Sequence, residues 1–526
     1  MLRIAATNGT NNTTFGGAIT LNNHLTLDDT AAPRVLVMSG ALNATGTSSA
    51  LTVTKGSGAG SVTLSGALTV GSGGLTFLST GSTTAGSVLT LSGAISGTGD
   101  ITFSNNTTVQ NGVTVSNASI NNTGAIRNVG TGTGNTLVSG NILTNVTSVQ
   151  QNGTSPLELG GVNTYTGPTT VTSGTLVLTG SASANGSLAG TAISVASAGT
   201  IVVQGSSATL NNYTIGATGS PTLSIATGGT LSLVDALANT LTINSATAGA
   251  TVLSLANGSQ LVFDVGPTAD SIQLGSGLLA AIASGGVVTV VPYLFGPLTS
   301  GSFTLISAPG GGLISGGLAD FQLSTTSLGG ATLGLTITDT ALVLNVTNPN
   351  NPTTLYFKGG VAGSTGGINA TWNGFVSANT NWTTDASGTT NAQALPSSVT
   401  DVHFYAAGTT TANLTTVLGQ NVEVRTLTLD GGTLTQAVSI VGTIPNTSNL
   451  NTLTITPLTP GAGITANSGA GADDHRPDRL GGRSDLDEQL QRRLERHRHP
   501  IQQPRTDAEQ QRHRRVHDQR HDVRHR

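Results

Sequence analysis

The chain has 526 residues, a formal net charge of −4 and no cysteine, and only 8% of its residues are charged, against roughly 25% in an ordinary soluble domain. The lack of cysteine excludes a disulfide-stapled module and a cysteine-based metal site. An apolar content of 36% at low net charge argues against a disordered polyelectrolyte. The charge gives no basic footprint for nucleic acid, so we expect no nucleic-acid partner.

The charges are concentrated at one end of the chain. Residues 1–472 contain 6 Lys or Arg and 13 Asp or Glu, whereas residues 473–526 contain 14 Arg and 11 acidic residues. Two chemically different sequences therefore meet near Ala472, and each needs its own interpretation.

Short runs in the first part alternate apolar residues with Thr or Ser and stop at Gly or Asn. Examples are residues 61–66 (SVTLSG), 175–180 (TLVLTG) and 230–234 (TLSLV). Period-2 alternation with β-branched residues and Gly punctuation indicates strands and turns. We therefore expect strands of about 4–6 residues throughout the first 472 residues.

Both a β-sandwich and a β-solenoid fit this pattern, and the surface chemistry favours the solenoid. Equivalent side chains of stacked coils lie about 4.8 Å apart, where like charges repel and Thr, Ser or Asn can form hydrogen-bonded ladders. We predict an all-β fold, a parallel β-helix or β-solenoid of short strands. At roughly 20 residues per coil, it would have about 24 coils.

The longest apolar run is residues 278–295, with no charge between Asp270 and Asp320. It contains Thr289, Pro292 and a Ser-Gly-Gly sequence at 284–286, and a membrane helix needs about 20 apolar residues. We therefore predict two buried strands here and no transmembrane segment.

One segment carries a specific motif. Residues 157–178 read LELGGVNTYTGPTTVTSGTLVL, which resembles the autotransporter-associated β-strand repeat, L-x-L-x-G-x-N-T-Y-T-G-x-T-x-V-x-x-G-T-L-x-L. Its residues fit a strand, a turn at Gly167 and a second strand, with Val171, Leu176 and Leu178 pointing inward and Tyr165 covering the coil edge. We assign structural roles to the matching positions Leu157, Leu159, Asn163, Tyr165, Gly167, Val171, Gly174 and Leu176.

A second segment resembles the opening of a unit in such proteins. Trp372, Trp382, the sequence DVHF at 401–404 and the sequence VRTLTL at 424–429 match the pattern W-x-G, N-W, D-x-V-x-F and V-x-x-L-x-L. The expected organisation is solenoid passenger repeats at 1–269, a closing β segment at 270–347, a linker at 348–355, the start of a second repeat unit at 356–472, and an Arg- and His-rich tail at 473–526.

The resemblance implies a passenger region of a bacterial surface or exported protein, extracellular or at the cell surface. Such a protein acts as an adhesin, a spacer or a surface structure, and its partners would be surface glycans or host or neighbouring cell surfaces. Residues 1–6 (MLRIAA) lack the apolar core of a signal peptide. We therefore expect that the sequence is a fragment or that its start is misplaced.

The tail at 473–526 has three interpretations. Its 14 Arg and 7 His could form a basic arm for nucleic acid, phosphate or metal, or a solvated disordered segment. The third is a reading-frame slip, because codons for Asp, Glu, His and Gln read one base later mostly encode Thr, Asn, Ser or Ile. We favour the frame slip, and the nucleotide sequence around codon 472 tests it.

Residues 1–472 offer few groups for chemistry. They contain two histidines, His24 and His403, and lack the G-x-S-x-G and H-E-x-x-H motifs of hydrolases and zinc proteases. A polysaccharide-degrading β-helix needs two carboxylates about 5–9.5 Å apart, for which the candidates are Asp264 with Asp270, and Asp28 with Asp29, beside His24. We predict no catalytic, cofactor or metal residues, and keep a polysaccharide-binding or polysaccharide-degrading enzyme as the alternative.

Overall fold

A computed structural model describes most of the first 466 residues. Outside the described residues lie 1, 6–11, 30–34, 46–48, 56–60, 82–87, 117–118, 181–185, 189, 206–211, 218–221, 284–285, 297, 315–319, 329–330, 348, 350, 361–369, 373–374, 377–378, 411–412, 419–421, 430–438, 442–451, 460 and 467–526. The described residues form strands and no α-helix, which confirms the predicted all-β class. The predicted tail at 473–526 lies outside them.

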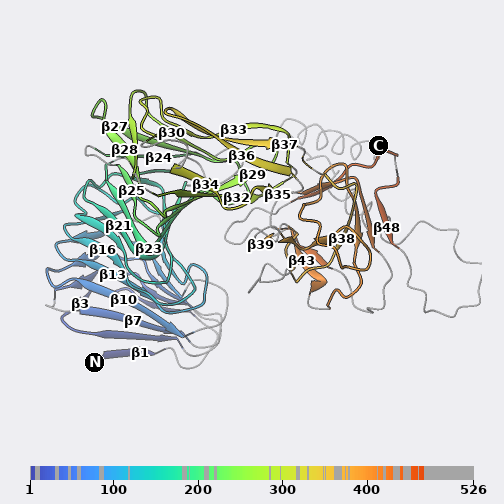
Figure 1. Ribbon diagram of the computed structural model, residues 1–526. Coiled ribbons are helices and arrows are strands. Elements are labelled where there is room, and N and C mark those ends of the chain that lie inside the picture. The colour runs from blue at the N-terminus through green and yellow to red at the C-terminus, as the bar shows by residue number, and fades with distance from the viewer. Residues whose placement is uncertain are drawn as a thin grey trace, which may run out of the picture. The chain divides into compact units, whose positions relative to one another are not determined.

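Most strands stack in parallel, coil upon coil, and form a β-solenoid of about 13 turns (Figure 1). Each early coil has three strands, one for each side of the solenoid. The ladder on the first side consists of β1 (Leu2–Ala5), β4 (Leu25–Asp29), β7 (Ser49–Lys55), β10 (Leu75–Gly81), β13 (Ile101–Asn105), β16 (Ala125–Asn128), β18 (Ser148–Gln151), β21 (Thr169–Thr179), β23 (Ile193–Gln204), β25 (Leu223–Ile225), β28 (Thr251–Leu255) and β31 (Leu279–Ile282).

A second parallel ladder runs beside the first. It consists of β2 (Thr13–Phe15), β5 (Val35–Met38), β8 (Ser61–Leu64), β11 (Leu89–Leu91), β14 (Val113–Val115), β17 (Thr136–Val138), β19 (Leu157–Gly160), β21, β23, β26 (Thr230–Ser232), β29 (Gln260–Val265), β32 (Val288–Leu294) and β34 (Phe321–Leu323). The long strands β21 and β23 belong to both ladders and join them into one sheet.

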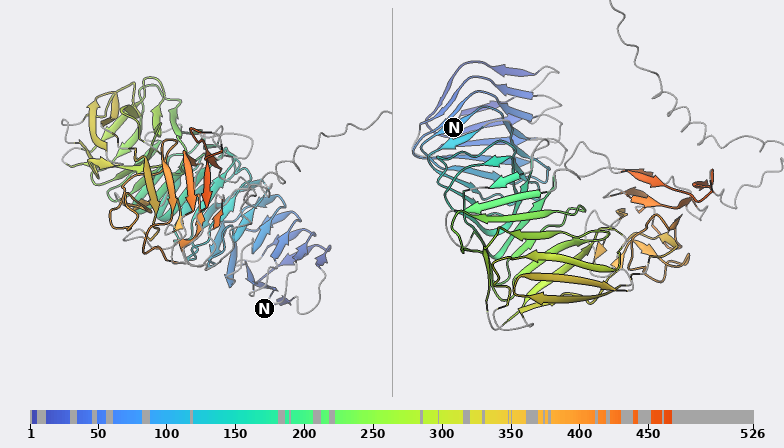
Figure 2. Two further views of the ribbon diagram at one scale, coloured as in Figure 1. Left: turned by 90° about the vertical axis from the view of Figure 1, so that its right-hand side faces the viewer. Right: turned by 90° about the horizontal axis from the view of Figure 1, so that it is seen from above.

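The third side has two successive sheets. The first contains β3 (Ile19–Leu21), β6 (Leu42–Ala44), β9 (Leu68–Val70), β12 (Ile95–Gly97) and β15 (Ile120–Asn122). The second contains the parallel strands β20 (Val162–Asn163), β22 (Gly186–Leu188), β24 (Asn212–Ala217), β27 (Thr240–Ser245), β30 (Ser271–Leu274) and β33 (Gly301–Ser307). Figure 2 shows strands of successive coils lying side by side along the solenoid.

Antiparallel strands follow the last parallel coil. In the second sheet of the third side, β33 pairs with β37 (Ala341–Thr347), which pairs with β36 (Ala331–Thr338), which pairs with β35 (Ser327–Leu328). Strand pairing therefore changes from parallel to antiparallel within residues 301–347, the later part of the segment expected to close the first unit.

Residues 354–466 form four further sheets. The largest contains β41 (Trp382–Thr383), β38 (Thr354–Phe357), β42 (Asp401–Phe404), β45 (Thr426–Leu429) and β48 (Ile464–Ala466). The others are strand pairs: β39 (Phe375–Val376) with β40 (Asn379–Thr380), β43 (Thr415–Val417) with β46 (Ser439–Val441), and β44 (Val422–Val424) with β47 (Leu453–Ile455).

The solenoid coils are longer and fewer than the sequence suggested. Val149 pairs with Thr169, 20 positions later, but Ile193 pairs with Leu223, 30 positions later. The expected 24 coils of about 20 residues were therefore wrong, because turns of variable length add residues between strands of fixed register and the coils end near residue 323.

The solenoid core consists of equivalent residues stacked from coil to coil. Leu25, Leu51, Phe77 and Phe103 are in register and buried, and the rings of Phe77 and Phe103 stack with centroids 5.7 Å apart. On the outer face, Thr63, Thr90 and Thr114 form a row of partly exposed hydroxyl groups. Alternation along each strand thus separates an apolar interior from a hydroxyl-bearing surface.

One corner of the early coils requires glycine because backbones come close together there. A Cβ atom on Gly66 would lie 2.0 Å from the carbonyl oxygen of Gly40, and one on Gly93 would lie 1.9 Å from that of Gly66. Each glycine begins a Gly-Ala step before a third-side strand. Glycine is therefore required at this corner because the backbones of neighbouring coils approach closely.

The apolar run at 278–295 forms strands β31 and β32, whose alternate residues are buried, as predicted. The described part of the chain has no helix whose length and hydropathy would suit it to crossing a membrane.

Candidate functional site

The motif at 157–178 lies where the two ladders join. Leu157 and Leu159 are on β19, Asn163 ends β20, and Val171 and Leu176 are on β21. The predicted inward orientation of Val171, Leu176 and Leu178 is confirmed by their burial. The fully buried side chains at matching positions of the motif are Leu157, Leu159, Asn163, Tyr165, Thr169, Val171, Leu176 and Leu178.

Tyr165 lies inside the solenoid, so the expectation that it covers a coil edge was wrong. Its hydroxyl group is 2.6 Å from Thr169 Oγ1, which is 3.0 Å from Thr191 Oγ1. The side chain of Asn163 accepts a hydrogen bond of 2.9 Å from the Ile142 amide. Burial raises the pKa of Tyr165, so its phenol stays protonated and serves as a structural hydrogen-bonding group.

The motif requires glycine at positions 167 and 174 for two different structural reasons. Gly174 has a φ of +68° within β21, a conformation that side-chain-bearing residues rarely adopt. A Cβ atom on Gly167 would lie 1.7 Å from the carbonyl oxygen of Thr147. Both glycines therefore permit the chain path, and the geometry assigns them no chemistry.

Three aspartates meet inside later coils. Asp264 and Asp270 are both fully buried, and the backbone amide of Asp264 donates a 2.5 Å hydrogen bond to the Asp270 carboxylate. Asp264 Oδ2 accepts hydrogen bonds from the amides of Asp235 and Ala236 at 2.8 and 2.7 Å. Asp270 Oδ1 accepts one from the Asn239 amide at 2.7 Å. The structure thus brings together the sequence-predicted pair and adds Asp235.

Burial is the main electrostatic influence on these acids. It raises the pKa of Asp235 to about 6, and burial together with the neighbouring Asp264 raises that of Asp270 to about 10. Burial also raises the pKa of Asp264 well above its ordinary value. Because Asp264 and Asp270 have no exposed surface, a polysaccharide chain does not reach them, and backbone amides use their oxygen atoms to hold successive coils.

Sequence reasoning missed Asp235, although a signal was present. The runs 231–235 (LSLVD) and 261–265 (LVFDV) both place an aspartate after a strand-like apolar segment, about one coil apart. Strands β26 and β29, which contain or precede these residues, are direct neighbours. Comparing strand ends at a spacing near 30 residues would have found the pair.

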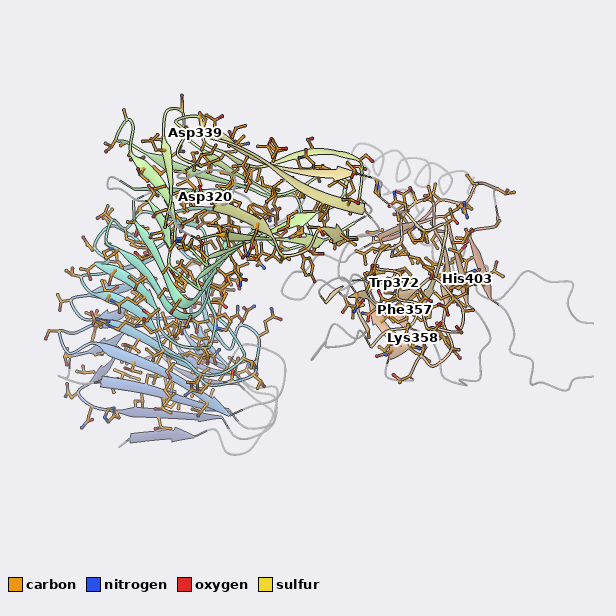
Figure 3. All side chains as sticks on the ribbon, in the orientation of Figure 1. Asp320, Asp339, Phe357, Lys358, Trp372 and His403 are labelled. Carbon is orange, nitrogen blue, oxygen red and sulfur yellow. The ribbon has the colours of Figure 1, made fainter. Side chains whose placement is uncertain are left out.

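The second candidate pair and the remaining acids of the first region occupy other places in the fold. Asp28 and Asp29 end β4, but their side chains lie outside the described ones, and His24 is exposed just before that strand. Asp339 accepts a hydrogen bond from the Gly312 amide at 2.9 Å, and Figure 3 shows Asp339 and Asp320 in the closing part of the first region. In the described part of the chain, no group of three His, Cys, Asp or Glu residues has a geometry that could hold a metal ion.

Trp372 and Trp382 belong to a buried aromatic cluster in residues 354–429. Their rings meet edge to face at 5.1 Å, and Phe357 contacts both Trp382, at 5.1 Å, and Phe404, at 4.7 Å. Trp382 Nε1 donates to the carbonyl oxygen of Trp372 at 2.7 Å, and Trp372 Nε1 donates to Thr416 Oγ1 at 3.0 Å. Both motif tryptophans are therefore core residues with satisfied indole groups.

The opposite, outer face of the same sheet carries polar and aromatic side chains. Tyr356 on β38 stacks on His403 of β42, with ring centroids 4.7 Å apart. Asp401 forms a two-pronged ion pair with Arg425 and accepts a 2.7 Å hydrogen bond from Thr426. Arg425 lowers the pKa of Asp401, so this carboxylate remains ionised near neutral pH. Figure 3 shows His403 near the Trp372 and Phe357 core.

Neither the family models nor the curated proteins that were compared with this chain give a match.

Proposed function

We propose that this protein is a non-catalytic, secreted or cell-surface β-solenoid passenger that acts as an adhesin, a spacer or a surface structure. The observation that carries the proposal is the pair of parallel ladders, which continue coil after coil from Leu2 to Leu323. Hydrogen bonds between coils run along the stacking direction, so each coil holds the next one in place along the axis of the solenoid.

The surface of the solenoid supports the same role. Rows of hydroxyl and amide side chains, such as Thr20, Asn43, Thr69, Ser96 and Asn121, follow one outer side in register. Neutral polar groups at this spacing avoid the repulsion that a column of like charges would create. Such a surface remains hydrated without charge, which suits a protein that extends from a cell.

The buried acids weigh against the enzymatic alternative. Glycoside hydrolysis uses two carboxylates that flank a bound glycosidic bond, whereas Asp264 and Asp270 are enclosed and accept backbone hydrogen bonds. The hydrogen bonds to Asp264 Oδ2 and to both oxygens of Asp270 support a structural role for this pair.

The experiment that tests the proposal measures location and catalysis separately. An epitope inserted between Ala248 and Gly249, in an exposed turn where no atom lies within 4 Å of the Gly249 Cβ position, should bind antibody on intact producing cells. An epitope detected only after lysis would contradict the proposal. Incubation of the purified chain with polysaccharides should release no oligosaccharides by mass spectrometry, and release that Asp264→Asn abolishes would establish the enzymatic alternative instead.

A further inference from the structure

We infer that the acid corner, formed by Asp235, Asp264 and Asp270, is a pH-sensitive contact between three coils of the solenoid. The corner is closed while its carboxyl groups hold protons, and it opens locally when they ionise. This regulatory property goes beyond the proposed function and does not depend on where the protein acts or what it binds.

The first feature of the acid corner is a backbone turn that holds a carboxyl group. Ala236 has a φ of +65°, and successive amides in such a turn form an anion-binding nest. Asp264 Oδ2, from the neighbouring coil, accepts hydrogen bonds from the amides of Asp235 and Ala236 at 2.8 and 2.7 Å. Alanine seldom has a positive φ, so the contact with Asp264 stabilises a strained turn.

The three acids connect three successive coils, whose strands β23, β26 and β29 are paired in that order. Asp235 Oδ2 accepts a 2.6 Å hydrogen bond from the amide of Gly205, which follows β23. Asp264 extends from β29 to the turn after β26. Asp270 accepts hydrogen bonds from the amides of Asn239 and Asp264 at 2.7 and 2.5 Å. Loss of these contacts would therefore separate the coils at this corner and leave the strand ladders in place.

The second feature is the absence of basic residues from this part of the sequence. Between Arg127 and Lys358 the chain contains six acidic residues and no Lys, Arg or His, so the coils that form the corner supply no positive side chain. Burial of an unpaired charge is strongly unfavourable, and a buried carboxyl group takes up a proton instead. Burial accordingly raises the pKa of all three acids.

Asp264 has one oxygen atom that can hold a proton without disturbing the turn. Its Oδ1 atom is buried and has no hydrogen-bond partner among the described residues, whereas Oδ2 occupies the nest. The titratable groups that face Asp264 are Asp235, Asp270 and Tyr293, which is in register with it on β32. Burial and Asp264 raise the pKa of Tyr293, so the phenol stays neutral and adds no counter-charge. Ionised carboxylates in the corner would therefore repel one another.

Asp235 determines the pH at which the corner begins to open. Its pKa is about 6 in the folded chain and about 4 when the opened corner exposes it to water. The stabilisation is thus complete below about pH 4 and is lost as the pH rises through the folded value. By this linkage, Asp235 alone should increase local opening about tenfold between pH 5 and pH 8. Asp270, with a pKa of about 10, extends the effect to higher pH.

Hydrogen–deuterium exchange of the full chain, measured by mass spectrometry at pH 5 and pH 8, tests the inference. Exchange times are scaled for the intrinsic pH dependence of amide exchange, and residues 61–70, which contain no acid, serve as the internal reference. Residues 233–239 and 264–271 should exchange about tenfold faster at pH 8, and the reference should not change. Equal protection at both pH values, or an equal change in the reference, would overturn the inference. This comparison uses the wild-type chain, so it does not require any variant to fold.

Two variants and a chelator identify the groups responsible. Asp235→Asn removes the acid that titrates between pH 5 and pH 8 and should abolish the tenfold change. Asp339→Asn is the matched control and should retain it, because Asp339 accepts an amide hydrogen bond from Gly312 at 2.9 Å but is exposed. An unaltered change in Asp235→Asn would contradict the inference. EDTA should have no effect at pH 8, since faster exchange that calcium reverses would show that a bound cation, not protons, neutralises the acids.

Discussion

The solenoid at residues 2–323 and the region at 354–466 bury their cores in different ways. In the solenoid, aliphatic residues and a few phenylalanines repeat in register, and each coil supports its two neighbours. In the later region, Phe357, Trp372, Trp382 and Phe404 form one cluster of contacting rings. Stability is thus distributed along the first region and concentrated at one point in the second.

This difference in core packing originates in how closely the backbones of successive coils approach at the turns. Coils that stack at a constant spacing need many small, equivalent contacts, and glycine corners let the backbones approach. In the described part of the later region, one five-stranded sheet is accompanied by three strand pairs, so fewer equivalent contacts repeat and large rings supply the buried surface. A substitution in the aromatic cluster should therefore lower stability more than a substitution at a single coil of the solenoid.

Removal of a central ring should give the largest effect. Trp382→Ala deletes a fully buried indole that contacts Phe357 and Trp372, and such truncations cost about 3–5 kcal/mol. Because the chain has two tryptophans, both in this cluster, fluorescence of the remaining Trp372 reports this region. Urea denaturation should show early loss of the Trp372 signal while the far-ultraviolet dichroism of the solenoid persists.

Leu261→Ala in the buried solenoid core is the control for this comparison. It should lower the dichroism midpoint and leave the tryptophan midpoint in place. A simultaneous shift of both signals in either variant would show that the two regions unfold together and would contradict the contrast.

Addition of one methyl group at a solenoid corner should give the next largest effect. Gly66→Ala would place Cβ 2.0 Å from the carbonyl oxygen of Gly40, so the coils must separate, and overpacking of this kind costs about 1–3 kcal/mol. Gly334→Ala is the matched control because no atom lies within 4 Å of its Cβ position. Its effect should stay within about 0.5 kcal/mol. Equal thermal midpoints for the two variants would refute the close-approach explanation.

These corners show what the sequence could reveal about the fold. Period-2 alternation in runs such as residues 61–66 predicts strands with the correct inner and outer faces, as Val62 and Leu64 confirm by burial. Coil length was not predictable in the same way, because turns between Ile193 and Leu223 add residues without changing the register. Hydrophobic periodicity predicts which side chains of a strand point inward, but it does not predict how many residues the turns between strands contain.

For the candidate sites too, the sequence reveals some features and not others. Asp264 and Asp270 could be selected as a pair because acids are scarce, but nothing in their sequence neighbourhood indicates that backbone amides would enclose them. Tyr356 and His403 are 47 positions apart and become neighbours through the pairing of β38 with β42. Parallel pairing across an intervening segment is a tertiary outcome, which short-range patterns do not encode.

A fall in pH should stabilise the solenoid and destabilise the later region. In the solenoid, raised folded-state pKa values mean that the native state holds more protons than the unfolded chain, so stability falls as the pH rises. Asp235 contributes from its unfolded pKa of about 4 to its folded value of about 6. Asp270 extends the range to about 10. The dichroism midpoint should therefore be higher at about pH 5 than at about pH 8.

In the later region, stability falls as the pH falls, because Arg425 lowers the pKa of Asp401. That stabilisation is complete above the unfolded pKa of about 4 and is lost as the pH falls through the lower folded value. The tryptophan midpoint should fall in strong acid. Asp270→Asn should flatten the solenoid profile and leave the tryptophan profile unchanged, whereas an unaltered solenoid profile would show that this buried acid does not control it.

The smallest effect is expected from a single oxygen atom in the motif. Tyr165→Phe keeps the buried ring and removes the hydroxyl group that lies 2.6 Å from Thr169 Oγ1. The loss of one buried hydrogen bond costs about 1 kcal/mol, and Thr169 retains its contact with Thr191 at 3.0 Å, which limits the penalty. The dichroism midpoint should fall slightly, with no change in the tryptophan midpoint. A double-mutant cycle with Thr169→Val isolates the pair, because a true hydrogen bond makes the two losses less than additive. Strictly additive losses would show that Tyr165 contributes only its ring to the solenoid interior.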